Sequence, residues 1–209
     1  MASGQKAVSN DYVELDAESD SKPDPVRNRI LRGAARVFGE RGYGASSVET
    51  ILTAAEVSRR TFYRTFRSKE DVLRTLFDNS VHMLLRAVKQ AVDPRFSRHE
   101  LRNAAVDAYI EVHANAGALA RVLLLEQFSP GSPLAAQRNR AHVTFTKLIT
   151  NVSIVAGRPA PDPVLVAAVV AGINQVCVQM AAQYPDGNWD LGRAKRAILC
   201  LLTALDEPA

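Results

Sequence analysis

The chain has only two cysteines and no segment that resembles a secretion signal. Cys177 and Cys200 are too few for a disulfide scaffold, and their spacing fits no metal-binding motif. We expect both to be buried thiols, although a redox pair is also compatible with the sequence. Residues 1–22 lack an apolar core and are acidic, unlike a secretory signal. These features predict a cytoplasmic protein.

Long apolar runs are also scarce. The longest nearly unbroken run, 164–173, is about half of the roughly 20 residues that cross a bilayer. We therefore expect no membrane-spanning helix and no membrane partner. Hydrophobic residues still make up 47% of the 209 positions, which is enough for a buried core.

The sequence lacks the motifs that are typical of enzyme active sites. It has no paired carboxylates, no Ser or Cys nucleophile motif and no glycine-rich loop that would cradle a phosphate. No acidic cluster or pair of histidines suggests a metal, and no motif suggests a cofactor. We predict a protein without catalytic residues and keep a helical enzyme as an alternative.

Positive charge is unevenly distributed. The net charge is +4, but residues 22–74 alone contain 12 Lys and Arg against six acidic residues. Such a stretch favours a polyanionic partner, because neutralised phosphates release condensed counterions. A solvated basic face without a partner would show the same charge.

Helix-start signals divide the chain into helices. Asp24-Pro25, Ser132-Pro133 and Asp162-Pro163 each place an N-cap side chain before a proline. Ser46-x-x-Glu49 and Ser97-x-x-Glu100 have the spacing of capping boxes. No hairpin turn separates alternating runs, and the Thr- and Val-rich stretch 143–155 fits a helical stripe better than a strand. We predict an all-α fold of about nine helices, at 25–41, 47–54, 58–65, 69–92, 97–115, 118–127, 133–156, 163–183 and 189–205.

Two short predicted helices, 47–54 and 58–65, carry the most specific pattern. Phe62 and Phe66 lie four residues apart and can anchor the second helix to its neighbours. Its opposite face presents Arg60 and Arg64, with Arg59 and Tyr63 beside them. An arginine-bearing helix with an aromatic anchor has the form of a recognition helix, in which Arg can bond guanine and hydroxyl groups can bond phosphates. A compact helical trio with a solvated basic face is the alternative.

The same region resembles the DNA-binding domain of the tetracycline-repressor (TetR) family of bacterial regulators. The resemblance covers about 26–77 and rests on four segments: AARVFGERGY at 34–43, SSVETI at 46–51, VSRRTFYRTF at 57–66 and Lys69-Glu70. It implies a homodimeric transcription regulator, usually a repressor, that binds a palindromic operator and a small-molecule effector. Base or phosphate contacts are then implied for Arg59, Arg60 and Thr61, and phosphate contacts for Ser47, Tyr63, Arg64 and Lys69.

Two positions differ from the family pattern. Glu56 stands in the turn where the family usually has Gly, and Thr65 stands where His is common. If residue 56 has a left-handed backbone, a non-glycine residue costs roughly 1 to 2 kcal/mol there. Otherwise the turn has a different shape.

The resemblance and the composition together suggest a division of the chain. We expect a disordered acidic tail at 1–23, a helix-turn-helix domain at 24–70 and an effector-binding and dimerisation domain at 71–209. The helices at 163–183 and 189–205 carry more apolar surface than one face needs, and Arg193, Lys195 and Arg196 are expected to point outward. We predict that these helices pair in a homodimer. They could instead be internal core.

The middle helices would hold the effector. Their candidate contacts combine apolar walls with a few polar groups: Tyr109, His113, Gln127, Phe128, His142 and Phe145. A histidine such as His113 is also common as a satisfied core or surface group. A DNA-binding dimer without an effector therefore remains an alternative.

Overall fold

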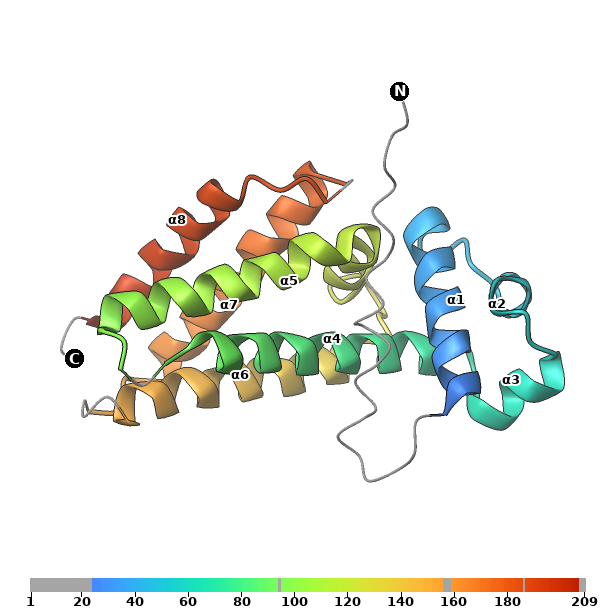
Figure 1. The fold of residues 1–209 in the computed structure, drawn as a ribbon, viewed down its shortest axis with the longest axis horizontal. Coiled ribbons are helices and arrows are strands. Elements are labelled where there is room, and N and C mark those ends of the chain that lie inside the picture. The colour runs from blue at the N-terminus through green and yellow to red at the C-terminus, as the bar shows by residue number, and fades with distance from the viewer. Residues whose placement is uncertain (1–23, 94, 156–158, 186, 207–209) are drawn as a thin grey trace.

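The computed structural model describes residues 24–93, 95–155, 159–185 and 187–206. Within these ranges every regular element is helical (Figure 1). The predicted all-α fold is confirmed, and the stretch 143–155 is helical as expected. The expected acidic tail, 1–23, lies outside the described residues.

Eight α-helices and a final 3-10 turn, η3, make up this part of the chain. Their bounds are α1 Pro25–Arg41, α2 Val48–Ala55, α3 Arg59–Thr65, α4 Lys69–Ala91, α5 Arg98–Glu126, α6 Ala135–Val155, α7 Pro163–Gln183, α8 Leu191–Thr203 and η3 Ala204–Asp206. The count is one below nine because α5 contains both of the helices predicted at 97–115 and 118–127, which meet at a kink. Gly117, at the expected break, has non-helical angles (φ 55°, ψ −128°) that kink this helix.

Side-chain caps explain where most helices start. Asp24, Ser58, Ser68, Ser97 and Asp162 each accept a hydrogen bond from a backbone amide of the first turn. These caps stabilise short helices by satisfying amides that have no partner within the helix.

The capping box predicted at Ser46 and Glu49 is wrong by one residue. Ser47 is the N-cap of α2, and it exchanges hydrogen bonds with Thr50. Ser46 is buried, and its hydroxyl donates to the Gly42 carbonyl at 2.6 Å. Because the N-cap is Ser47 and not Ser46, the residue three positions later is Thr50 and not Glu49.

Helices α1–α3 form a trio at one end of the molecule, and α4 runs from this trio along the remaining helices (Figure 1). Helix α1 packs closely on α2, since a Cβ added to Gly33 would lie 2.8 Å from the Ala55 amide nitrogen. One hydrophobic core extends from Ile30 and Phe62 through Leu76 to Ile198. The trio is therefore fixed to the larger helical body by continuous packing.

Helix α7 is apolar over a longer stretch than the nearly unbroken run at 164–173 suggested. With 21 residues, it is the one helix in the described ranges that is long and apolar enough to cross a membrane by length and composition. Only 33% of its most apolar window is buried. It packs against α5, α6 and α8, which leaves part of its apolar surface uncovered.

Two surface expectations near the C-terminus are wrong. Lys195 does not point freely outward, because its Nζ donates to Asp107 Oδ2 on α5 at 2.7 Å. Cys200 is exposed, whereas Cys177 is buried as expected, and neither is in a disulfide. Lys195 lies close enough to the interface between α5 and α8 for its side chain to reach α5.

Candidate functional site

Helix α3 is anchored on one side by aromatic rings. Phe62 and Phe66 are 0% and 2% exposed, and their ring centroids are 6.1 Å apart. The Arg27 guanidinium of α1 lies 4.7 Å from the centre of the Phe66 ring. A helix of this length is only marginally stable alone, so these contacts fix its orientation.

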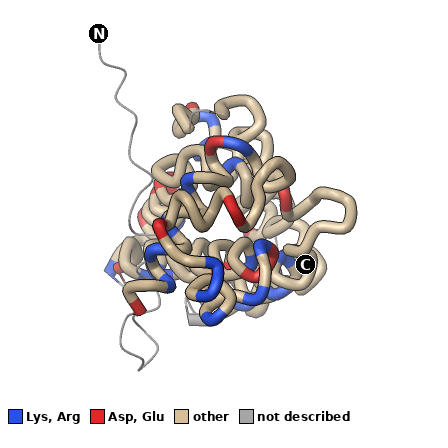
Figure 2. Tube along the Cα trace, turned by 90° about the vertical axis from the view of Figure 1, so that its right-hand side faces the viewer, with Lys and Arg blue, Asp and Glu red and all other residues tan. Residues whose placement is uncertain are grey.

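The other side of α3 faces solvent. Arg60 and Arg64 are exposed, and Tyr63 is 48% exposed while its ring packs edge-on against Phe62. Figure 2 shows Lys and Arg positions spread over the end of the molecule that carries the trio, with some acidic positions among them. The geometry presents two guanidinium groups and a phenol on a rigid support.

Arg59 and Thr61 are already engaged within the trio. The Arg59 side chain is 61% exposed and forms an ion pair with Glu49 of α2. The Ser58 hydroxyl lies 2.8 Å from that of Thr61 and accepts the Thr61 amide. A contact of either residue with a ligand must compete with, or share, these bonds.

Ser47 and Lys69 lie at helix starts. Ser47 caps α2, and the Lys69 Nζ donates to the carbonyls of Tyr43 at 2.9 Å and Ser46 at 2.8 Å. The ammonium also lies 4.2 Å from the centre of the Tyr43 ring. Lys69 therefore fastens the loop between α1 and α2 to α4, and it keeps one of its three N–H donors for another partner.

Sequence reasoning missed this cluster. The Tyr43 hydroxyl donates to Glu70 Oε1 at 3.2 Å, and burial together with the nearby Glu70 carboxylate raises the pKa of Tyr43. The only available signal was that Tyr43 and Lys69-Glu70 both belong to the segments of the resemblance. Their spacing of 26 residues gives no local indication of contact.

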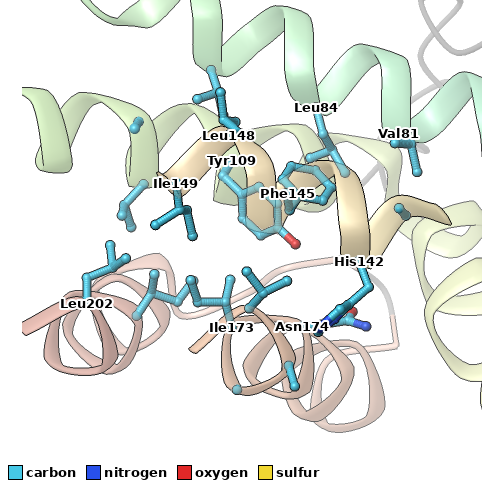
Figure 3. Close-up of a pocket in the computed structure, with 18 of the residues that line it drawn as sticks. Val81, Leu84, Tyr109, His142, Phe145, Leu148, Ile149, Ile173, Asn174 and Leu202 are labelled. Atoms are coloured by element: carbon cyan, nitrogen blue, oxygen red, sulfur yellow. The ribbon is translucent and has the colours of Figure 1, made fainter. Parts of the chain in front are cut away.

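A cavity of about 1440 Å³ lies among α4–α8. All six residues that the sequence suggested for an effector contact line it: Tyr109, His113, Gln127, Phe128, His142 and Phe145. Figure 3 shows Tyr109 and Phe145 beside each other, with Leu84 above and Ile173 and Asn174 on the facing helix. The volume exceeds the roughly 300 to 1,000 Å³ typical of ligand pockets, and the lining is mainly apolar.

His113 is a buried polar residue of the cavity wall. It is 8% exposed, its ring stacks on Trp189 at 5.9 Å, and Tyr109 lies edge-on at 5.0 Å. Its Nε2 has no hydrogen-bond partner. Burial lowers the pKa of His113 to about 4, so the ring is uncharged at neutral pH.

The neighbouring polar groups are bonded to each other. Asn174, which sequence reasoning missed, points its Nδ2 at Gln127 Oε1 at 3.4 Å. Arg138 donates to the Gln127 carbonyl at 2.8 Å, and its guanidinium lies 5.1 Å from the centre of the exposed Phe128 ring.

Burial raises the pKa of Cys177 to about 12, which leaves an unreactive thiol next to Tyr109. Among the described residues, no three His, Cys, Asp or Glu side chains group as metal ligands.

Part of the sequence is similar to that of known regulatory proteins. The sequence model of bacterial regulatory proteins, tetR family, matches residues 30–76. The repressor DhaR of Mycobacterium sp. (strain GP1) is 36% identical over 78 residues, which are 35% of this chain and 39% of DhaR. The activator FasR of Mycolicibacterium smegmatis is 31% identical over 88 residues, 42% of this chain and 40% of FasR. The chain thus spans about two fifths of the length of these curated relatives.

Solved structures extend the likeness in fold to most of the chain. The fatty acid degradation regulator FadR of Bacillus halodurans superimposes with a TM-score of 0.73 at 21% identity, covering 90% of this chain and 100% of FadR. FadR of Bacillus subtilis, solved with stearoyl-CoA, gives 0.69 at 23% identity, covering 83% and 96%. The family model covers residues 30–76, which contain most of the helical trio, so this part of the chain is similar to the bacterial regulatory proteins of the tetR family.

Proposed function

We propose that the protein is a homodimeric transcription regulator that binds a palindromic DNA operator in the cytoplasm and is released from it by a small-molecule effector. The observation that carries this proposal is α3, whose buried Phe62 and Phe66 hold Arg60 and Tyr63 outward. A rigid basic helix of this kind enters the major groove in helix-turn-helix proteins.

Individual roles follow from exposure. Arg60 reads a base edge, with Arg59 and Thr61 beside it, because the first residues of a recognition helix lie deepest in the groove. Tyr63 and Arg64, further along α3, bond the phosphate backbone. Ser47 at the start of α2 and the remaining N–H donor of Lys69 add phosphate contacts.

The second copy covers α7 and α8. The outer surface of α7 carries apolar and small residues, among them Val164 at 77% exposure and Ala168. Pairing these helices around a two-fold axis buries that surface and places two copies of α3 on one DNA duplex. DhaR is a repressor, which supports repression as the direction of control.

The cavity is the effector site. Its volume and apolar wall suit a long hydrocarbon chain, and the Bacillus subtilis FadR neighbour holds stearoyl-CoA, a long-chain acyl thioester. An effector that binds the DNA-incompetent arrangement more tightly weakens DNA binding, and DNA weakens effector binding by the same factor.

Fluorescence anisotropy tests the DNA-binding proposal. A labelled duplex is first selected from a randomised library, and its affinity is then measured at rising salt. We expect a steep log–log decline, because several phosphate contacts release counterions. Arg60→Ala is expected to lose about 1 to 3 kcal/mol on the selected duplex, whereas Tyr63→Phe weakens all duplexes alike.

The matched control is Arg86→Ala, which removes an exposed arginine from α4. It is expected to bind as the parent protein does. Equal affinity of the Arg60→Ala, Arg86→Ala and parent proteins for the selected duplex would contradict the assignment of α3.

A further inference from the structure

The cavity wall around His113 combines aromatic rings with a nitrogen that has no hydrogen-bond partner. Trp189 stacks on this ring and Tyr109 lies edge-on to it, while Phe145 packs edge-on against Tyr109. His113 lines the cavity and is more than nine-tenths buried, and its Nε2 has no hydrogen-bond partner. Leaving such a nitrogen unsatisfied costs free energy that a bound ligand can recover.

Other polar groups of the cavity wall form bonds within the protein. The Asn174 amide is turned to Gln127, and Arg138 is held by the Gln127 carbonyl and the Phe128 ring. The Tyr109 hydroxyl points toward the helix that carries Ile173 in Figure 3, and it has a side-chain hydrogen bond with Cys177 of the same helix. Within the described residues, His113 Nε2 is the one buried side-chain nitrogen or oxygen of the cavity wall that has no hydrogen-bond partner.

Four cations line the cavity, namely Lys89, Arg98, Arg102 and Arg138, and none of them contributes to the lowered pKa of His113, whose one cause is burial. Arg98 and Arg102 line its far end and pair with Asp206, roughly 16 to 22 Å from His113 along α5 at about 1.5 Å per residue. An anionic group placed beside His113 would be buried without a counter-charge, which is strongly unfavourable. An uncharged oxygen has no such cost.

The apolar part of the cavity gives the ligand its shape. Lining residues on α4 run from Phe77 to Lys89, which spans roughly 18 Å along the helix axis at about 1.5 Å per residue. Leu84, Ile149 and Leu202 face this space (Figure 3). The wall fits an extended hydrocarbon chain.

We propose that His113 Nε2 receives the uncharged oxygen of an elongated aliphatic effector, such as a fatty alcohol or the carbonyl of a fatty acyl ester or thioester, and that the site discriminates against free fatty carboxylates. This inference rests on the proposed effector site and adds the class of its ligand. An alcohol donates to the bare nitrogen, whereas a carbonyl accepts from the other tautomer, in which Nε2 carries the proton.

The chain carries its own reporter for this contact. Trp189 is the single tryptophan, and it stacks on His113. A ligand that bonds His113 changes the surroundings of the indole, so tryptophan fluorescence reports occupancy at this position. Calorimetry on the same samples measures affinity without relying on the indole.

The test compares dodecanol, methyl dodecanoate and dodecanoate on the full chain at neutral pH. We expect the alcohol and the ester to bind about tenfold more tightly than the carboxylate and to change Trp189 fluorescence. His113→Phe keeps an aromatic ring against Trp189 but removes the nitrogen. It is expected to lose about tenfold in affinity for dodecanol and little for dodecanoate. The control His99→Phe, at an exposed position of α5, is expected to behave as the parent.

Two results would overturn the proposal: dodecanoate binding as tightly as dodecanol, or His113→Phe retaining the parent affinity for dodecanol. DNA binding is measured in parallel by anisotropy. Retained DNA binding alongside either result rejects the role of His113 and leaves the regulator intact. A dodecanol preference that His113→Phe abolishes, in a protein that does not bind DNA, supports the site and rejects the proposed function.

Discussion

Glu56 shows how a single residue accommodates an unfavourable backbone. It has φ 51° and ψ 47°, so the turn keeps the left-handed conformation that the family usually gives to glycine. Of the two possibilities left by the sequence, the structure has the strained residue and not a different turn. The Glu56 amide still donates to the carbonyls at the end of α2.

Replacing Glu56 tests this strain. Glu56→Gly is expected to raise the free energy of unfolding by about 0.5 to 1 kcal/mol, because relief of the left-handed strain exceeds the added entropy of the unfolded chain. Glu56→Ala keeps the Cβ and is expected to give no gain. Urea denaturation of both variants measures the difference, and a Glu56→Gly protein less stable than Glu56→Ala would contradict the assignment.

Burial of His113 predicts a pH dependence of stability. The group titrates near 6.5 when free but near 4 in the fold, so between these values the unfolded chain binds a proton that the folded chain does not. The contribution of neutral His113 to stability is therefore full above about pH 6.5 and declines as the pH falls toward 4. Thermal unfolding of His113→Phe is expected to lose less stability over this window than the parent. Parallel curves for the two proteins would rule out the buried neutral imidazole.

At the scale of elements, the kink at Gly117 links the cavity to the trio. Gly117 lies one helical turn after His113, and the next residue packs on α1, where a Cβ added to Gly39 would lie 3.2 Å from the Ala118 Cβ. Movement of α5 around this kink can thus reach α1 through direct packing. This contact supplies a physical route from the proposed effector site to α1 of the trio.

The kink requires glycine at position 117 because of the backbone angles there, and not because a side chain would clash with its neighbours. A Cβ at Gly117 meets no other atom within 4 Å, but φ is positive there. Gly117→Ala is expected to lower the free energy of unfolding by about 1 to 3 kcal/mol. Gly44→Ala, at an exposed position with equally open space and no positive φ, serves as the control in chemical denaturation. Equal stability of the two variants would show that α5 straightens without cost.

Local signals explain which elements were predictable. Asp24, Ser58 and Ser97 cap helices where the sequence placed their starts, because a cap depends only on residues within one turn. The binding partners of Lys69 and Lys195 were not predictable. Each crosses to another helix or loop, and such contacts depend on tertiary packing that periodicity does not encode.

The candidate site was likewise predictable in part. The exposed and anchored faces of α3 followed from the four-residue spacing of Phe62 and Phe66. The six cavity residues were correctly grouped, but the cavity's size and the unpartnered nitrogen of His113 depend on how α4–α8 pack. Cys200 was assigned to the interior because composition alone does not tell a core face from an uncovered one.

At the scale of the whole molecule, the uncovered face of α7 predicts a dimer. Ala168 is exposed on this face, and Ala168→Arg places a charge where the second copy would pack. Sedimentation is expected to show a dimer for the parent at micromolar concentration and a monomer for this variant. Ala136→Arg, on an exposed position of α6, is expected to remain dimeric. A monomeric parent protein would refute the assembly.

The proposed function requires two copies of α3 to bind one DNA duplex, and sequence selection from a randomised DNA library tests this most directly. The parent is expected to select an inverted repeat whose half-sites are separated by whole helical turns of about 34 Å. Arg60→Ala is expected to keep that spacing and lose preference at one symmetric pair of positions. Selected sequences without an inverted repeat, or an unchanged preference in Arg60→Ala, would contradict it.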